Sequence, residues 1–149
     1  MLFTGNVMPE FMERSSLFVY QNIYLIREDE QYLLPSNWLI ISESNNCILS
    51  LTLDLLYAYW KKENGVRNYL IYHLFFTIAA HKYAEEWKRV PVYSNQPCHV
   101  LQFEMLDEYN STRWDEILKM SDFHKLNWRY QKNPEIYSMS DHIIDRFGN

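Results

Sequence analysis

His124 and Lys125 are adjacent between two aromatic stretches, and together they could hold a metal ion and a phosphate group. A neutral imidazole can be one ligand of Mn²⁺ or Mg²⁺, and a lysine ammonium can neutralise diphosphate charge. Neighbouring side chains on a regular strand point to opposite faces, so a shared site requires a loop or a bulge. A solvated strand edge is the plainer explanation, and the spacing alone leaves both interpretations open.

Two further histidines could also take part in chemistry. Cys98 and His99 could form a nucleophile and its base, but on an extended chain their side chains would point apart. A structural pair in a loop is therefore favoured. His73 lies in an otherwise apolar segment, where a core histidine bonded to the backbone is favoured over a ligand or a substrate contact.

A tryptophan and an acidic run complete the set of candidates. Asn37 and Trp38 begin a predicted strand, and the face of Trp38 could stack on a sugar ring or could simply be buried. Residues 28–30 form the run Glu-Asp-Glu, which could bind a divalent cation. A solvated loop is the favoured interpretation of this run.

Several function classes are disfavoured by composition. The chain has 149 residues, three glycines and two cysteines, with a net charge of -5. It contains no glycine-rich phosphate loop and no GxSxG elbow, and its cysteines lack zinc-site spacing. The acidic balance argues against a nucleic-acid partner. The cysteine usage predicts a reducing, cytoplasmic setting, and the longest apolar run falls short of the roughly 20 residues that span a bilayer.

Residue periodicity predicts an α/β chain. Strands are expected over residues 1–7, 16–22, 37–44 and 124–130. Helices are expected over residues 9–14, 47–63, 68–82, 113–120 and 140–147. The side chains expected to face inward on the 68–82 helix are Leu70, Leu74, Phe75 and Ile78. Residues 92–102, with a central proline, are expected to form a loop.

Six segments in a fixed order resemble a known family. They are "LFVYQN", "SNWLI", "AYWKKEN", "YLIYHLFF", "VPVYSNQPCHVLQ" and "HKLNWRY". Their order and spacing are similar to those of the bacterial capsular polysaccharide synthesis protein family, over roughly residues 2–130. The resemblance implies a GT-A-type glycosyltransferase that carries a DxD metal motif. No D-x-D occurs in this sequence, and the opening "MLFTGNVMPEF" resembles the region just downstream of that motif.

The resemblance also implies roles for particular residues. His124 would be a late metal ligand for Mn²⁺ or Mg²⁺, and Lys125 would contact the donor diphosphate. Asn37, Trp38, His73, Asn95 and His99 would line the donor or acceptor pocket. The partners would be a nucleotide sugar and a glycan acceptor.

The expectation is therefore a partial GT-A-like domain with a mixed sheet and packed helices, occupying residues 1–133, followed by a polar tail over 134–149. Because the carboxylates of the DxD motif are missing, the chain alone is expected to be inactive. A non-catalytic glycan- or protein-binding module and an unrelated α/β interaction domain remain as alternatives. Peripheral membrane association stays open, and self-association is expected through a cut sheet edge.

Overall fold

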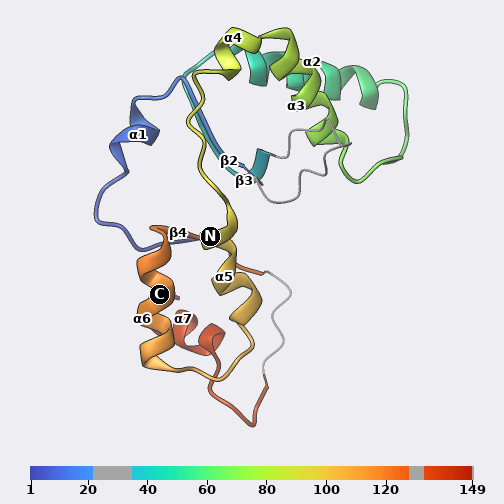
Figure 1. The fold of residues 1–149 in the computed structure, drawn as a ribbon. Helices are drawn as coiled ribbons and strands as arrows, with labels where there is room; N and C mark the ends of the chain where they lie inside the picture. Colours follow the sequence, from blue (N-terminus) through green and yellow to red (C-terminus); the bar gives the residue numbers. More distant parts are fainter. Residues whose placement is uncertain (22–34, 128–132, 149) are drawn as a thin grey trace, which may run out of the picture. The chain divides into compact units, whose positions relative to one another are not determined.

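The computed structural model describes residues 1–21, 35–127 and 133–148. Within these residues the chain contains seven helices and two small antiparallel sheets, which confirms the α/β class (Figure 1). The strands form two separate two-stranded sheets instead of the expected mixed sheet. The chain divides into two compact units, one made of residues 8–95 and the other of residues 1–7 and 96–149.

The unit of residues 8–95 is built on an antiparallel pair of strands. Strand β2 (Leu17–Gln21) pairs with β3 (Pro35–Ser42), and a register shift lies between Val19 and Gln21. Because side chains alternate along a strand, β2 buries both of its faces. Leu17 and Val19 join the cluster made with the helices, and Phe18 packs in an aromatic group with Phe11 and Tyr93.

Four helices complete this unit. They are α1 (Glu10–Glu13), α2 (Cys47–Trp60), α3 (Ile71–Lys82) and α4 (Ala84–Trp87). In the sequence, residues 44–46 (Ser-Asn-Asn) offer caps for this helix. This expectation is confirmed, because the Asn46 side chain accepts hydrogen bonds from the backbone N–H groups of Ile48 and Leu49. Tyr83, with φ -114° and ψ 52°, separates α4 from α3.

The predicted inward face of α3 is wrong at Leu70 and Ile78, whereas Leu74 and Phe75 are half-buried. Leu70 and Ile78 are exposed, and the buried apolar side chains are those of Phe76, Ala79 and Ala80. The segment is apolar on almost every side, so helical spacing alone could not select the packed face. The two alanines give α3 a small-residue face that allows close packing.

The second unit joins both ends of the chain. Strand β1 (Leu2–Phe3) pairs antiparallel with β4 (Phe123–His124). Its helices are α5 (Gln96–Glu104), α6 (Ser111–Met120) and α7 (Met139–Phe147). Its core contains Leu2, Leu101, Met105, Trp114, Ile117, Met139 and Ile143.

Helix α5 corrects the expected loop over 92–102. Pro97 is the second residue of the helix, where its missing N–H costs no intrahelical hydrogen bond. The strand expected over 124–130 is also shorter than predicted, because β4 ends at His124 and residues 128–130 lie outside the described residues.

The expected C-terminal helix is confirmed as α7, which begins with a capping box between Ser138 and Asp141. This helix buries Met139 and Ile143 in the core of its unit. The predicted boundary at residue 133 stays a prediction.

Candidate functional site

His124 is the most deeply buried of the candidate residues. It is 0% exposed in β4, opposite Leu2 of β1. Its Nε2 lies 3.5 Å from Thr4 Oγ1, and its Nδ1 has no hydrogen-bond partner among the described residues. Burial lowers the pKa of His124, although the Ser121 backbone and the Asp122 charge act in the opposite direction. Burial therefore favours the neutral form of the imidazole.

Lys125 follows β4 and is fixed to α5 through its backbone. Its N–H donates a hydrogen bond of 2.8 Å to the carbonyl oxygen of Cys98. Lys125 has no ion-pair partner among the described residues. Burial lowers the pKa of His99, and the positive charge of Lys125 lowers it further. The charge of Lys125 thus acts on His99, whereas the charge that acts on His124 is that of Asp122.

Cys98 and His99 lie on α5 and not on an extended loop. The Sγ of Cys98 is buried and lies 3.2 Å from Ser121 Oγ. The His99 ring faces Phe103, with 6.4 Å between ring centroids. The thiol therefore contacts Ser121, the C-cap residue of α6. This contact supports the structural interpretation of Cys98.

The other unit brings Asn95 to the strand that carries Asn37 and Trp38. Asn95 Nδ2 donates a hydrogen bond of 3.1 Å to Ser36 Oγ, next to exposed Asn37. The Trp38 ring stacks on Tyr20, with 5.6 Å between centroids and 8° between planes. Tyr20 therefore covers one face of the ring.

His73 lies on α3, half-buried beside Tyr72. The two rings meet edge to face at 5.4 Å, and His73 Nδ1 has no hydrogen-bond partner among the described residues. Burial lowers the pKa of His73 and raises the pKa of Tyr72 to about 12. A core histidine bonded to the backbone was the favoured expectation, and no such bond to the Nδ1 is present in the described part of the chain.

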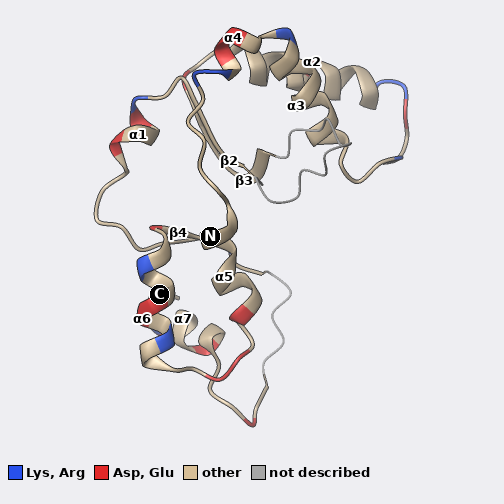
Figure 2. Cartoon of the chain, in the orientation of Figure 1, with Lys and Arg blue, Asp and Glu red and all other residues tan. Residues whose placement is uncertain are grey.

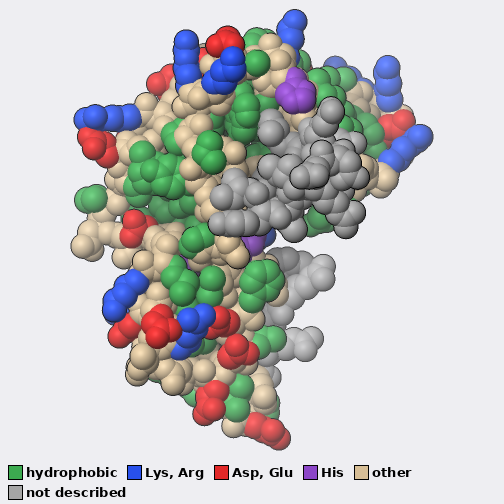
Figure 3. All heavy atoms as spheres, viewed as in Figure 1, with side chains coloured by type: hydrophobic (Ala, Val, Ile, Leu, Met, Phe, Trp, Pro, Cys, Tyr) green, Lys and Arg blue, Asp and Glu red, His purple; other side chains and the backbone are tan. Residues whose placement is uncertain are grey.

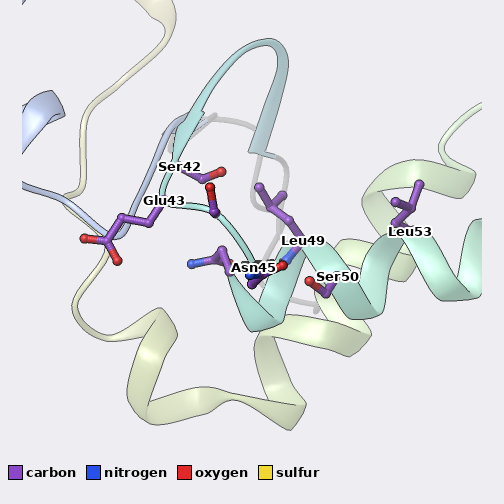
Figure 4. Close-up of a pocket in the computed structure, with 8 residues that line it drawn as sticks. Ser42, Glu43, Asn45, Leu49, Ser50 and Leu53 are labelled. Carbon is purple, nitrogen blue, oxygen red and sulfur yellow. Dashed lines mark hydrogen bonds between the residues drawn. The ribbon is translucent and has the colours of Figure 1, made fainter.

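A pocket between β3 and α2 was not predicted from the sequence. It has a volume of about 350 Å³, and Figure 4 shows side chains from the β3–α2 connection and the first turns of α2 around it. Its lining includes Glu43, Asn45 with φ 62°, and Asn46. Asn46 already accepts from the N–H groups of Ile48 and Leu49, so those backbone donors are not available to an anion.

A comparison with family models identifies the chain's relatives. The model described as capsular polysaccharide synthesis protein matches residues 1–143. The chain belongs to this family. Neither the curated proteins nor the solved structures contain a match.

Family membership raises the question of whether the described residues suit the metal expected at His124. A buried Nδ1 without a partner could supply one ligand bond. No group of three or more histidine, cysteine, aspartate or glutamate side chains could hold a metal ion within residues 1–21, 35–127 and 133–148. Hard divalent cations require several oxygen ligands, so these residues do not form such a site by themselves. The acidic run at residues 28–30 lies outside the described residues.

For this family member, no helix in the described ranges is both long enough and apolar enough to cross a membrane.

Proposed function

We propose that this capsular polysaccharide synthesis protein takes part in sugar transfer from a nucleotide-diphosphate donor to a hydroxyl group of a glycan acceptor. In this proposal the chain is a glycosyltransferase related to the GT-A type, and that relationship rests on family membership. In this proposal the reaction takes place in the reducing, cytoplasmic setting that the cysteine usage of the sequence predicts.

The observation that carries the proposal is the position of Lys125 against α5, where its backbone N–H bonds the carbonyl oxygen of Cys98, the residue before His99. Lys125 has a positive charge with no ion-pair partner in the described ranges, and its backbone is held by α5. Sugar transfer releases a nucleoside diphosphate, so negative charge develops on the leaving phosphate. A preorganised ammonium stabilises such charge more effectively than water does. Lys125 is therefore assigned to the donor diphosphate, and His99 to the proposed donor site beside it.

The other residues receive supporting roles in the proposal. His124, the residue before Lys125, is fully buried. It would contribute a single nitrogen ligand to a metal ion if the oxygen ligands came from elsewhere. When bound, Mn²⁺ or Mg²⁺ would add charge neutralisation at the diphosphate. Asn37, Trp38 and Asn95 would line a sugar-binding surface in the unit of residues 8–95, and His73 of α3 would contact substrate in that unit as well.

Nucleotide titration tests this assignment without requiring turnover. UDP and GDP are titrated by calorimetry, with and without Mn²⁺, into the wild-type chain, Lys125→Met and Lys119→Met. Lys119 lies in the last turn of α6 in the same unit and provides a matched loss of charge. We expect binding of one nucleotide to weaken by about tenfold or more in Lys125→Met, as for loss of a charge-assisted hydrogen bond. Lys119→Met should bind as the wild type does.

A non-catalytic glycan-binding module is the second candidate function. It is favoured by the lack of a metal-binding side-chain cluster among the described residues. Wild-type protein that binds neither nucleotide but binds capsular oligosaccharide would support this candidate. A tryptophan response lost in Trp38→Ala would place that oligosaccharide near Trp38.

A further inference from the structure

The connection between α2 and α3 exposes a group of large apolar side chains. Tyr57 is 59% exposed, Trp60 is 46% exposed and Tyr69 is 93% exposed. Val66 and Leu70 are exposed as well. We call the set the α2–α3 tip, and it consists of Tyr57, Trp60, Lys61, Lys62, Val66, Arg67, Tyr69 and Leu70. Leu53 extends the apolar stripe by one helical turn, because positions 53, 57 and 60 share a helix face.

The α2–α3 tip has a defined conformation. The Tyr59 hydroxyl donates to the carbonyl oxygen of Gly65 at 2.8 Å and accepts from the N–H of Arg67 at 3.0 Å. The Tyr59 ring also packs edge to face with Trp60 and Phe75. One tyrosine therefore fixes the connecting loop to the end of α2. The exposed aromatic side chains lie on this ordered base.

Positive charge surrounds the same apolar side chains. Between residues 57 and 70 the charged residues are Lys61, Lys62, Glu63 and Arg67, a local net charge of +2. Glu63 is paired with Arg67 at 2.7 Å, which leaves Lys61 and Lys62 without ion partners among the described residues. Figure 2 shows these basic residues along the loop that joins α2 to α3, and Figure 3 shows basic side chains beside hydrophobic ones in this region. The basic tip contrasts with the net charge of -5 for the whole chain.

We propose that the α2–α3 tip is a docking surface for an anionic phospholipid bilayer. Tryptophan and tyrosine rings are favoured at the headgroup level, where one part of the ring is apolar and another is wet. Lysine stems can lie along apolar surface while their ammonium groups reach lipid phosphates. The exposed aromatic rings suit the boundary between headgroups and acyl chains, and Lys61 and Lys62 suit the lipid phosphates.

Charge distinguishes the bilayer from a second copy of the chain. A symmetric dimer formed through this surface would bring two identical basic tips together, and their like charges would repel. An anionic bilayer neutralises the same charges. The proposal does not depend on the proposed transferase activity, since it concerns a different surface and a different ligand.

Vesicle co-sedimentation tests the proposal with the full chain. The vesicles contain phosphatidylcholine alone or phosphatidylcholine mixed with phosphatidylglycerol. We expect binding only to the anionic vesicles, and binding that weakens as salt rises. Each basic residue at an anionic surface contributes about fivefold, so Lys61→Gln combined with Lys62→Gln should weaken binding by about 25-fold. Lys88→Gln combined with Arg89→Gln removes an equal charge from the end of α4 and should leave binding within about twofold of wild type.

Tryptophan fluorescence supplies an independent readout of insertion. The wild-type emission should shift to shorter wavelength with anionic vesicles, and Trp60→Phe should lose most of that shift. Circular dichroism confirms that each variant is folded. The proposal is overturned if the wild type does not bind anionic vesicles, or binds both vesicle types equally. Equal losses in the two double variants would also overturn it, as would a dimer that is abolished by Trp60→Ser and does not bind vesicles.

Discussion

The N–H of Lys125 and the carbonyl oxygen of Cys98 form a 2.8 Å hydrogen bond that joins the end of β4 to α5. Ser121 Oγ reaches the same part of α5, at 3.2 Å from Cys98 Sγ. These contacts explain why the charge of Lys125 acts on His99 although the two residues are distant in sequence. The candidate donor site therefore depends on one strand end and one helix.

The burial of His124 predicts a structural effect of its removal. His124→Ala leaves a cavity beside the β1–β4 pair, because the ring is fully buried there. We expect the free energy of unfolding to fall by about 2 kcal/mol or more, as for other buried large-to-small changes. Urea unfolding measures this value. His81→Ala is the control, since exposed His81 is in the last turn of α3, and equal losses in both variants would contradict the placement of His124.

The stability of the chain should also fall in mild acid. His124 has a lowered pKa in the folded protein, so below its ordinary value of 6.5 the unfolded chain binds a proton that the native state does not. The contribution of neutral His124 to the free energy of unfolding is therefore complete above pH 6.5. As the pH falls below 6.5, this contribution decreases by up to about 1.4 kcal/mol per pH unit. His73, His99 and His142 shift in the same direction.

Urea unfolding of the wild type and of His124→Asn is measured between about pH 7.5 and pH 5.5. The difference between the two proteins gives the part of the pH dependence of the free energy of unfolding that is due to His124. The asparagine variant cannot titrate there and should show the shallower dependence on pH. Parallel curves for the two proteins would mean that His124 keeps its ordinary pKa in the folded state.

Sequence patterns predicted most helices because their local signals agree. Asn46 stands directly before an apolar helical repeat, and it caps α2 as expected. Helix α5 was missed because Pro97 was interpreted as part of a loop. A proline in the first helical turn loses no hydrogen bond, so its position within the helix decides its effect.

The sequence could select candidate site residues, but it could not predict which of them lie close together in the fold. Sequence spacing could select His124 and Lys125 as neighbours, but it could not show that Lys125 acts on His99. That relationship requires α5 as a helix and its packing against β4. Residues 37–44 were expected to form a strand and residues 44–46 to offer helix caps, so the pocket between β3 and α2 was also missed.

The corrected face of α3 predicts different effects at two nearby positions. Phe76 is fully buried and packs edge to face on Trp87, whereas Ile78 is exposed. Phe76→Ala should lower the free energy of unfolding by about 3–5 kcal/mol. Ile78→Ala should change it by about 0.5 kcal/mol or less. Guanidinium unfolding of both variants tests the assignment, and a larger loss at Ile78 would restore the face predicted from spacing.

The cap of α2 predicts different effects of substitution at two adjacent asparagines. Asn46 accepts hydrogen bonds from Ile48 and Leu49, and its Nδ2 donates to the carbonyl oxygen of Ser16 at 3.2 Å. Asn46→Ala should therefore lower the free energy of unfolding by about 1–2 kcal/mol. Asn45 has φ 62°, a conformation that glycine adopts without strain, so Asn45→Gly should be nearly neutral.

Thermal unfolding followed by far-ultraviolet circular dichroism compares the two variants. A loss at Asn45 with no loss at Asn46 would show that the left-handed residue, and not the side-chain cap, fixes the start of α2. Because Asn46 also binds Ser16 beside β2, its loss should loosen the connection between the sheet and α2 as well as the helix end. Faster amide exchange at Leu49 and at the end of β2 in Asn46→Ala would detect that loosening directly.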